Sequence, residues 1–481
     1  MPNPVQGRAR LIGFAVGLAA FAASLLVPTP EGLTPEAMRV AGVAALMAAW
    51  WIVEVIPVSA TALLPVVLFP LLGIASVGGT TAPYADPIVF LFLGGFILGI
   101  ATQRWELHRR IGFGIIASVG TSPARISAGL MLATGFLSMW VSNTATALMM
   151  LPIATSVLAL FDRNIDDARS KENLGVLLML SVAYGASIGG IATLIGTPPN
   201  ALLAGLMARE YDIQIGFAQW MVLGVPVSAG MLVAAWLVLT RLHPVALTNA
   251  VDMDEVIGRG RRELGTLSPA EIRVICVLVA AAIGWIFRPL LTPYVPALND
   301  TTVAVAAALA LFLLPSGMPK GGRLLTWDDL KELPWGVLLL FGGGLTLAAA
   351  IESSGLAAWL ASTMSGLGSW PVILIVAAVT VGMIFLTELT SNTASAATFL
   401  PFAAAVAISL GLPPLVLAVP LAIAASCAFM LPVATPPNAI IFASGRVTIA
   451  QMARAGVWLN LIATAIIVLG GYPLIGFLFA K

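Results

Sequence analysis

Two short polar peptides each occur twice in this chain of 481 residues. Ser-Asn-Thr-Ala stands at Ser142–Ala145 and Ser391–Ala394, and Thr-Pro-Pro-Asn-Ala follows each copy, at Thr197–Ala201 and Thr435–Ala439. Their hydroxyl, amide and carbonyl oxygens are hard, neutral ligands that suit Na⁺ better than a transition metal, which prefers His, Cys or carboxylates. Free N–H groups at helix N-termini can bind an anion without arginine. The four peptides together could therefore hold an anion beside small cations.

The peptides lie in matching order in two halves of the chain, which indicates a duplicated fold. The Ser-Asn-Thr-Ala copies are 249 residues apart, and each is followed by a proline at the same distance, Pro152 and Pro401. The segment Phe92–Gly95 also resembles Leu340–Gly343, which agrees with a duplicated fold. In another interpretation, Ser, Thr and Asn only join helices while Pro and Gly only kink them. That interpretation explains single residues but not their paired order.

The composition places these peptides inside a membrane protein. The residues are 59% hydrophobic and 9% charged, with a net charge of +1, whereas soluble domains carry about 25% charged residues. Long apolar runs such as Gly456–Phe479 exceed the strands of a β-barrel. We therefore expect an all-α polytopic membrane protein with no nucleic-acid partner. The run Leu11–Val27 reads as a first span rather than a cleavable signal peptide.

The hydrophobic pattern predicts eleven transmembrane helices and two re-entrant hairpins. The spans lie near 11–28, 38–57, 59–74, 86–103, 173–207 (broken), 216–241, 270–288, 299–315, 335–351, 413–444 (broken) and 453–479, and the hairpins near 125–161 and 371–410. Five crossings separate the hairpins. Because this number is odd, the hairpins would open on opposite sides, which is an inverted repeat of the kind that secondary transporters use.

Four segments follow from this division. They are an N-terminal segment with the first transmembrane helix at 1–37, a first inverted repeat at 38–241, a cytoplasmic linker at 242–269 and a second inverted repeat at 270–481. With the N-terminus inside, every one of the 23 Lys and Arg residues lies on the cytoplasmic side except Arg39, Arg209, Arg288 and Lys481. We therefore expect a plasma-membrane protein, in a bacterium an inner-membrane protein, with a cytoplasmic N-terminus.

The local sequence predicts how the peptides are folded. Ser142–Thr144 separates two apolar arms without the Gly, Pro or charge of a surface turn, and Ser and Asn favour helix N-caps. Such a tip at membrane depth must be buried in protein or line a wet cavity. In the other peptides we expect Gly196 or Ala434 to end one half-helix and Thr197 or Thr435 to cap the next. The prolines that follow suit the first turn of a helix.

The remaining polar residues do not indicate an enzyme. The two histidines, His108 and His243, lie at predicted membrane edges, and no intramembrane pair of aspartates is present. We therefore predict no catalytic residue. Glu388 is an acid deep in the second hairpin. It could accept a proton or stand near a cation, as intramembrane acids often do, or it could simply be paired within the protein, and both alternatives stay open.

The chain resembles the divalent anion:sodium symporter family, the dicarboxylate, citrate and sulfate carriers. The segment Ala425–Ile441 is similar to the family signature and departs from it in the final Ile, where Val is usual. The resemblance covers nearly the whole chain. Because Ser-Asn-Thr is present in both copies, the chain resembles the dicarboxylate carriers in particular.

This resemblance implies roles for individual residues. One Na⁺ site would use Ser138, Ser142, Asn143 and the Gly196 carbonyl, and the second would use Thr387, Ser391, Asn392 and the Ala434 carbonyl. The substrate carboxylates would be held by Asn143, Thr144, Asn392 and Thr393, with Thr197 and Pro436 lining the pocket. The family fold implied is a homodimer with a scaffold domain at the interface and a transport domain that moves as an elevator.

The function that we expect is Na⁺-coupled symport of a C4-dicarboxylate such as succinate, fumarate or malate. Na⁺ would be the transported coupling ion, and the lipid bilayer and a second copy of the chain would be the other partners. Three alternatives stay open. They are dicarboxylate exchange without cation coupling, Na⁺-coupled transport of another divalent anion such as citrate or sulfate, and a channel.

Overall fold

The computed structural model describes residues 4–120, 122–161, 165–246, 264–319, 321–363 and 369–479. Over these residues the secondary structure is helical, apart from one isolated bridge between Pro315 and Arg323. Eight of the described helices are long and apolar enough to cross a membrane. The expectation of an all-helical polytopic chain is thereby confirmed. Most of the expected linker at 242–269, namely residues 247–263, lies outside the described residues.

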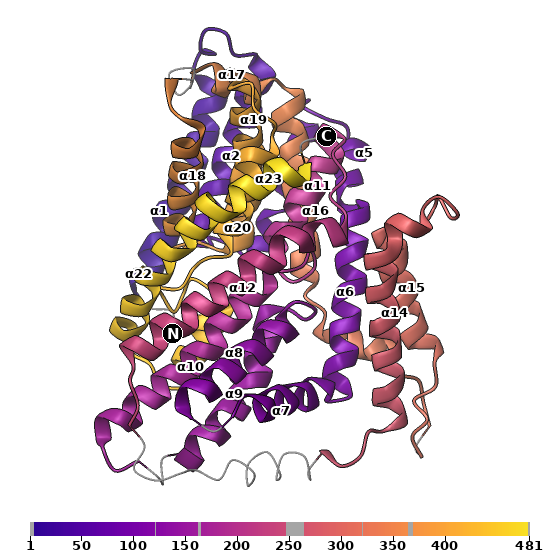
Figure 1. Cartoon of the computed structure of the whole chain (residues 1–481). Coiled ribbons are helices and arrows are strands. Elements are labelled where there is room, and N and C mark those ends of the chain that lie inside the picture. The colour runs from indigo at the N-terminus through magenta and orange to yellow at the C-terminus, as the bar shows by residue number, and fades with distance from the viewer. Residues whose placement is uncertain are drawn as a thin grey trace.

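The described residues of the first half form thirteen helical elements, which Figure 1 shows in their arrangement. They are α1 Pro4–Leu26, α2 Pro35–Val53, α3 Val58–Thr61, α4 Leu64–Leu71, α5 Val77–Thr81, η1 Ala82–Ala85, α6 Pro87–Arg104, α7 Leu107–Val119, α8 Pro123–Ser138, α9 Asn143–Phe161, α10 Ala168–Gly190, α11 Pro198–Tyr211 and α12 Phe217–Leu242. The predicted single span 59–74 is divided into α3 and α4. Pro65 lies in the first turn of α4, where its missing N–H favours a new helix over a continued one.

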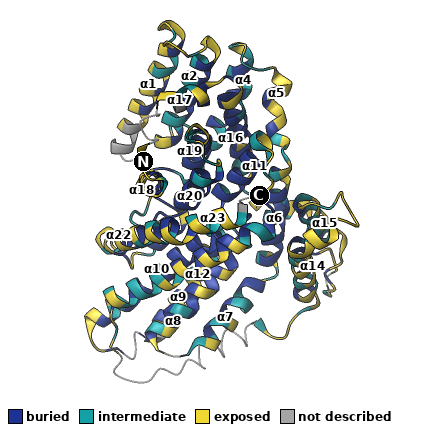
Figure 2. Cartoon of the chain, turned by 45° about the horizontal axis from the view of Figure 1, so that its top comes forward, coloured by how far each residue is buried: buried dark blue, intermediate teal, exposed yellow. Residues whose placement is uncertain are grey.

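The second half follows a similar order. Its elements are α14 Pro269–Leu291, α15 Asp300–Leu313, η2 Trp327–Glu332, α16 Trp335–Ser353, α17 Leu356–Thr363, α18 Val372–Thr387, α19 Asn392–Ser409, α20 Leu415–Ala425, α21 Pro436–Ala443, α22 Ile449–Ala465, the π-helical η4 Ile466–Gly471 and α23 Tyr472–Phe479. In Figure 1, α14 and α15 stand at one edge of the molecule, where α15 packs on α6. Figure 2 shows exposed residues along α1 and α15, whereas α16 is largely buried.

The first helices of the two predicted repeats, α2 and α14, share local features that the sequence analysis missed. Thr34-Pro35 begins α2 and Ser268-Pro269 begins α14, and each hydroxyl caps its helix. The arginine five positions after each cap donates to a carbonyl at the end of the following helical segment: Arg39 to Leu72 O at 2.9 Å, and Arg273 to Pro315 O. The tryptophans at matching positions, Trp51 and Trp285, each donate to a nearby carbonyl at 2.9 Å.

The central helices of the two halves interleave. α8 and α9 form one helix pair, α18 and α19 form the other, and the segments that join the members of each pair carry the Ser-Asn-Thr peptides. α10 packs against α8 and α9, and α20 packs against α18 and α19. In addition, α9 packs against α21, and α11 packs against α19. Each half therefore contributes helices to the surroundings of the other half's peptides.

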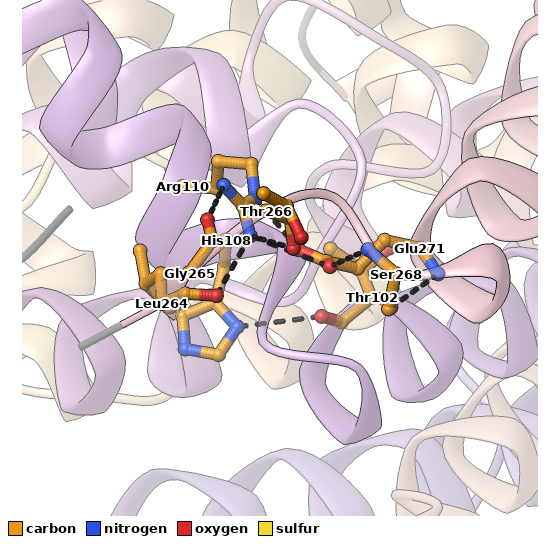
Figure 3. Close-up of polar contacts among 8 residues, drawn as sticks. All are labelled: Thr102, His108, Arg110, Leu264, Gly265, Thr266, Ser268 and Glu271. Carbon is orange, nitrogen blue, oxygen red and sulfur yellow. Dashed lines mark hydrogen bonds and ion pairs between the residues drawn. The ribbon is translucent and has the colours of Figure 1, made fainter. Parts of the chain in front are cut away.

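The short helix α7 is fastened to the start of α14 (Figure 3). Arg110 donates to Glu271 Oε1 at 2.7 Å and to the carbonyl oxygens of Leu264 and Gly265 at 3.1 Å each. Glu271 also accepts from Ser268 N at 2.7 Å, so one carboxylate caps α14 and pairs with α7. Beside Arg110, burial lowers the pKa of His108, whose Nδ1 lies 3.3 Å from Thr102 O.

Candidate functional site

The tip of the first helix pair is bonded to the broken helix beside it. Ser138 ends α8, and its hydroxyl lies 2.6 Å from the Asn143 amide and donates to Ala186 O at 2.7 Å. In the amide orientation that satisfies its neighbours, Asn143 Nδ2 lies 3.1 Å from Ala186 O and 3.2 Å from Gly196 O. Ser142 Oγ accepts from Ala145 N at 3.3 Å and so caps α9.

The second tip repeats this arrangement. Thr387 ends α18, and its hydroxyl lies 2.7 Å from Asn392 Oδ1 and 3.0 Å from Ala425 O. Thr387 thus takes the place of Ser138, and Asn392 that of Asn143. Ser391 stands at the N-cap position of α19 without using its side chain as a cap. The two matched hydroxyl–amide pairs each tie a tip to a half-helix of the same repeat.

The breaks in the two long helices are longer than the sequence predicted. α10 ends at Gly190 rather than Gly196, and α20 ends at Ala425 rather than Ala434, so the breaks cover residues 191–197 and 426–435. Gly196 and Ala434 lie inside the breaks, immediately before the N-cap residues of α11 and α21. Prolines account for the start of each second half-helix. The prolines do not reveal where the first half-helix ends. Side chains elsewhere in the chain bind the backbone carbonyl groups at and beyond that end.

Those side chains include Asn200 and Asn438, to which the sequence analysis gave no role. Asn200 Nδ2 donates to Thr193 O at 2.8 Å and to Ile191 O at 3.2 Å. Asn438 Nδ2 donates to Leu431 O at 3.0 Å and to Ala428 O at 3.2 Å. The signal was present in the sequence, because both residues are the fourth member of the repeated Thr-Pro-Pro-Asn peptide.

The two expected cap threonines behave differently. Thr435 Oγ1 accepts from Asn438 N at 3.2 Å and caps α21 as predicted. Thr197 occupies the N-cap position of α11 but makes no side-chain cap, so the prediction for its side chain was wrong. Its hydroxyl instead lies 3.3 Å from Ser426 Oγ in the opposite break. Both residues are almost completely buried, and this contact competes with capping for the one hydroxyl.

Glu388 is fully engaged by the second break. Its carboxylate accepts from the backbone N–H groups of Phe429 at 2.7 Å, Met430 at 2.9 Å and Leu431 at 3.1 Å. It also accepts from Asn460 Nδ2 at 2.8 Å, and the residue is 3% exposed. The structure therefore supports the alternative in which this acid is paired within the protein.

The first break has no such carboxylate, since the matching position is Met139. There the Thr193 hydroxyl donates to Met139 O at 2.6 Å and accepts from Gly196 N at 3.0 Å. The two breaks consequently differ in that an acid binds N–H groups of the second, whereas among the described residues only neutral groups, including the Thr193 hydroxyl and Trp220 Nε1 at 3.0 Å from Ile191 O, are seen to bind the first.

The contact between Thr197 and Ser426 links the two tips. Gly196, next to Thr197, presents its carbonyl to Asn143, and Ala425, next to Ser426, presents its carbonyl to Thr387. A continuous path of hydrogen bonds and neighbouring residues thus joins the first tip to the second. The structure brings six of the twelve expected site residues into one network, namely Ser138, Asn143, Gly196, Thr197, Thr387 and Asn392.

Six expected residues lie outside this network, namely Ser142, Thr144, Ser391, Thr393, Ala434 and Pro436. Ser142–Thr144 and Ser391–Thr393 are half-buried, Pro436 is exposed at the start of α21, and Ala434 is buried. None of the four peptides contains Lys, Arg or His. Four helices, α9, α11, α19 and α21, begin at these peptides. Their N–H groups and hydroxyls can bind an anion, and their amide and carbonyl oxygens can bind a small cation.

Comparison with known proteins identifies close relatives. The family model for the sodium:sulfate symporter transmembrane region matches residues 8–478. A sodium-dependent dicarboxylate transporter of Staphylococcus saprophyticus is 39% identical over 474 residues, which cover 97% of this chain and 91% of the relative. A protein of the same name from Staphylococcus aureus strain NCTC 8325 is 42% identical over 475 residues, covering 96% of this chain and 91% of the relative.

Two solved structures are similar in fold. The YdaH transporter of Alcanivorax borkumensis superposes with a TM-score of 0.57 at 12% identity and covers 99% of this chain and 98% of its own. MtrF of Neisseria gonorrhoeae gives a TM-score of 0.54 at 13% identity, covering 96% and 94%. At these identities the likeness concerns the fold alone, and it extends over nearly the entire chain.

Proposed function

The chain belongs to the family defined by the sodium:sulfate symporter transmembrane region, and we propose that it couples Na⁺ to the uptake of C4-dicarboxylates such as succinate, fumarate and malate. The family consists of transporters rather than enzymes. The names of the staphylococcal relatives support both the cation and the substrate class. The observation that carries the proposal most directly is the matched pair of tips, joined through Thr197 and Ser426.

Each tip would hold one Na⁺. The first site would use Ser138, Ser142, Asn143 and the Gly196 carbonyl, and the second would use Thr387, Ser391, Asn392 and the Ala434 carbonyl. The short hydroxyl–amide contacts in both tips support this assignment, since they bring expected ligand residues together at the ends of two helices. A bound cation would take the amide oxygens as ligands, and the tips would become ordered around it.

The dicarboxylate would lie between the tips. Asn143 and Thr144 would bind one carboxylate and Asn392 and Thr393 the other, with Thr197 and Pro436 at the border of the pocket. In this conformation the Thr197 hydroxyl faces Ser426, so it would contribute by joining the half-sites. A dianion in a site without a cationic side chain would be stabilised by positive charge in addition to the partial charges of the helix N-termini. Two Na⁺ ions would supply that charge, which couples the cation to the substrate.

The proposed architecture follows the same symmetry. It comprises eleven transmembrane helices and two re-entrant hairpins, divided into the segment 1–37, the inverted repeats 38–241 and 270–481, and the cytoplasmic linker 242–269. The matched contacts of Arg39 and Arg273 support this division. The transporter would act as a homodimer in the plasma membrane, with a cytoplasmic N-terminus and an elevator movement of the transport domain against the scaffold.

Uptake into proteoliposomes tests the proposal. Labelled succinate should accumulate when an inward Na⁺ gradient is imposed, and it should not accumulate when K⁺ replaces Na⁺. Equal uptake under both conditions would reject the coupling, and uptake that requires internal dicarboxylate would identify an exchanger. Parallel assays with citrate and sulfate decide the substrate class, since preference for either would replace the dicarboxylate assignment.

A further inference from the structure

The asparagines at the end of the Thr-Pro-Pro-Asn peptides make matched contacts in both breaks. Asn200 Nδ2 bonds to the carbonyls of Gly190, at 3.4 Å, and Thr193, at 2.8 Å. Asn438 Nδ2 bonds to the carbonyls of Ala428 and Leu431 at 3.2 and 3.0 Å. Both acceptors in the second break stand 238 residues after those in the first, which is also the distance between the two asparagines. The contacts are therefore a feature of the repeat.

Both amides are held deep in the protein. Asn200 and Asn438 are 0% exposed, and the Oδ1 atom of each is buried without a hydrogen-bond partner among the described residues. A buried carbonyl oxygen without a partner destabilises a fold, and such atoms require a specific explanation. The same unfavourable feature occurs in both halves. The contacts that do form are those of the amide nitrogens, and they point to a purpose common to both halves.

That purpose lies in the geometry around Gly190. A Cβ at this position would lie 2.6 Å from the Asn143 amide and 2.8 Å from Gly196 O, so both groups pack directly against the Gly190 backbone. Asn200 bonds to the carbonyl of the same Gly190. By holding the Gly190 backbone in place, the Asn200 amide fixes the positions of Asn143 and of the Gly196 carbonyl.

We propose that Asn200 and Asn438 are positioning residues, one for each cation site. Each amide binds carbonyl groups of its own break. The carbonyl of the residue before the N-cap threonine, which is Gly196 in the first break and Ala434 in the second, is then left to bind the cation. This inference rests on the proposed function, because the ion is Na⁺. The residues act through the backbone and do not themselves bind the ion.

The two halves should respond unequally. The second break is also held by the carboxylate of Glu388, which binds three of its N–H groups, whereas the first break is held by neutral groups, the Thr193 hydroxyl and the Trp220 indole. Loss of the Asn200 amide should therefore disturb its cation site more than loss of the Asn438 amide.

Thermal unfolding of the purified, full-length protein over a Na⁺ series, with choline as the balancing ion, tests the proposal. The Na⁺ concentration that gives half of the rise in melting temperature should increase about tenfold in Asn200→Ala and by a smaller factor in Asn438→Ala. The matched control is Asn173→Ala, since Asn173 Nδ2 also donates to a backbone carbonyl, that of Pro244 at 2.8 Å, but outside either break. The control should keep the wild-type Na⁺ dependence.

The proposal is overturned if both variants melt at a lower temperature but respond to Na⁺ at wild-type concentrations, because the amides would then act on stability alone. If Asn200→Ala does not fold, Asn200→Ser is measured in its place and the same outcomes apply. A wild-type protein that shows no Na⁺-dependent shift would instead overturn the proposed function, and this inference with it. The two failures are thus separated by the wild-type measurement.

Discussion

The hydroxyl groups of Thr197 and Ser426 lie 3.3 Å apart, and they connect the break in the first half of the chain to the break in the second. Thr197 follows the Gly196 carbonyl near the first tip, and Ser426 follows the Ala425 carbonyl bonded to the second. A change at one half-site can therefore reach the other through two neighbouring residues. A carrier that binds one solute between two half-sites needs such a connection.

Removal of this contact should weaken both half-sites together. Thr197→Val keeps the shape of the side chain but removes its hydroxyl, and Ser426→Ala removes the partner. A hydrogen bond contributes about 1 kcal/mol, which corresponds to about a fivefold rise in the KM for succinate. The double variant should be no worse than the more impaired single variant, as measured by initial uptake rates. Additive losses would mean that the hydroxyls act independently. Thr155→Val, on the exposed face of α9, serves as the control.

Substitution of Gly190 should abolish transport because the site has no room for a methyl group. The new Cβ of Gly190→Ala would lie 2.6 Å from the Asn143 amide, so the tip must move. We expect at least a tenfold loss of Na⁺-driven uptake. The matched variant Gly382→Ala adds the same methyl group to α18, where the space is open. It should leave uptake unchanged, and equal behaviour of the two variants would contradict the proposed packing.

Neutralising Glu388 should destabilise the second break. In Glu388→Gln one carboxylate oxygen becomes an NH₂ group that faces backbone N–H donors, and buried donors left without a partner cost about 1–3 kcal/mol each. We expect a melting temperature several degrees below wild type and a loss of uptake. Glu332→Gln, at an exposed position, should match wild type in both measurements. A stable and fully active Glu388→Gln would show that the three N–H contacts are dispensable.

Arg110 and its neighbour Arg109 offer a test of how α7 is fastened (Figure 3). Arg110 pairs with Glu271, whose side chain is 7% exposed, while Arg109 pairs with the exposed Glu106. Removing one partner of a largely buried pair is more costly than breaking a surface pair, which contributes about 0–1 kcal/mol. Arg110→Ala should therefore lower the melting temperature in detergent clearly more than Arg109→Ala. The reverse order would exclude Glu271 as the main anchor of α7.

Much of this organisation could be predicted from the sequence because it rests on local signals. Long apolar runs identify membrane helices, and the repeated Ser-Asn-Thr peptides marked the tips where Ser138 and Thr387 meet Asn143 and Asn392. The start of each second half-helix followed from proline chemistry.

Other features depend on contacts between distant segments, and these could not be predicted. Asn200 and Asn438 bind carbonyls up to ten residues earlier, at the end of α10 and inside the break that follows α20. The Thr197 side chain turns from its own helix toward Ser426 because the opposite break offers a hydroxyl there. The sequence leaves two interpretations of Glu388 open. Its partners are three backbone N–H groups in the break between α20 and α21, far from it in the sequence.

The central claim is that Na⁺ and a dicarboxylate bind together at the two joined tips. Equilibrium binding of labelled succinate to the purified protein, with Na⁺ or with choline, measures this most directly. We predict saturable binding in Na⁺, at least tenfold weaker binding in choline, and loss of binding in Asn143→Ala and in Asn392→Ala. Equal affinity in the two salts, or wild-type binding by both variants, would contradict the account.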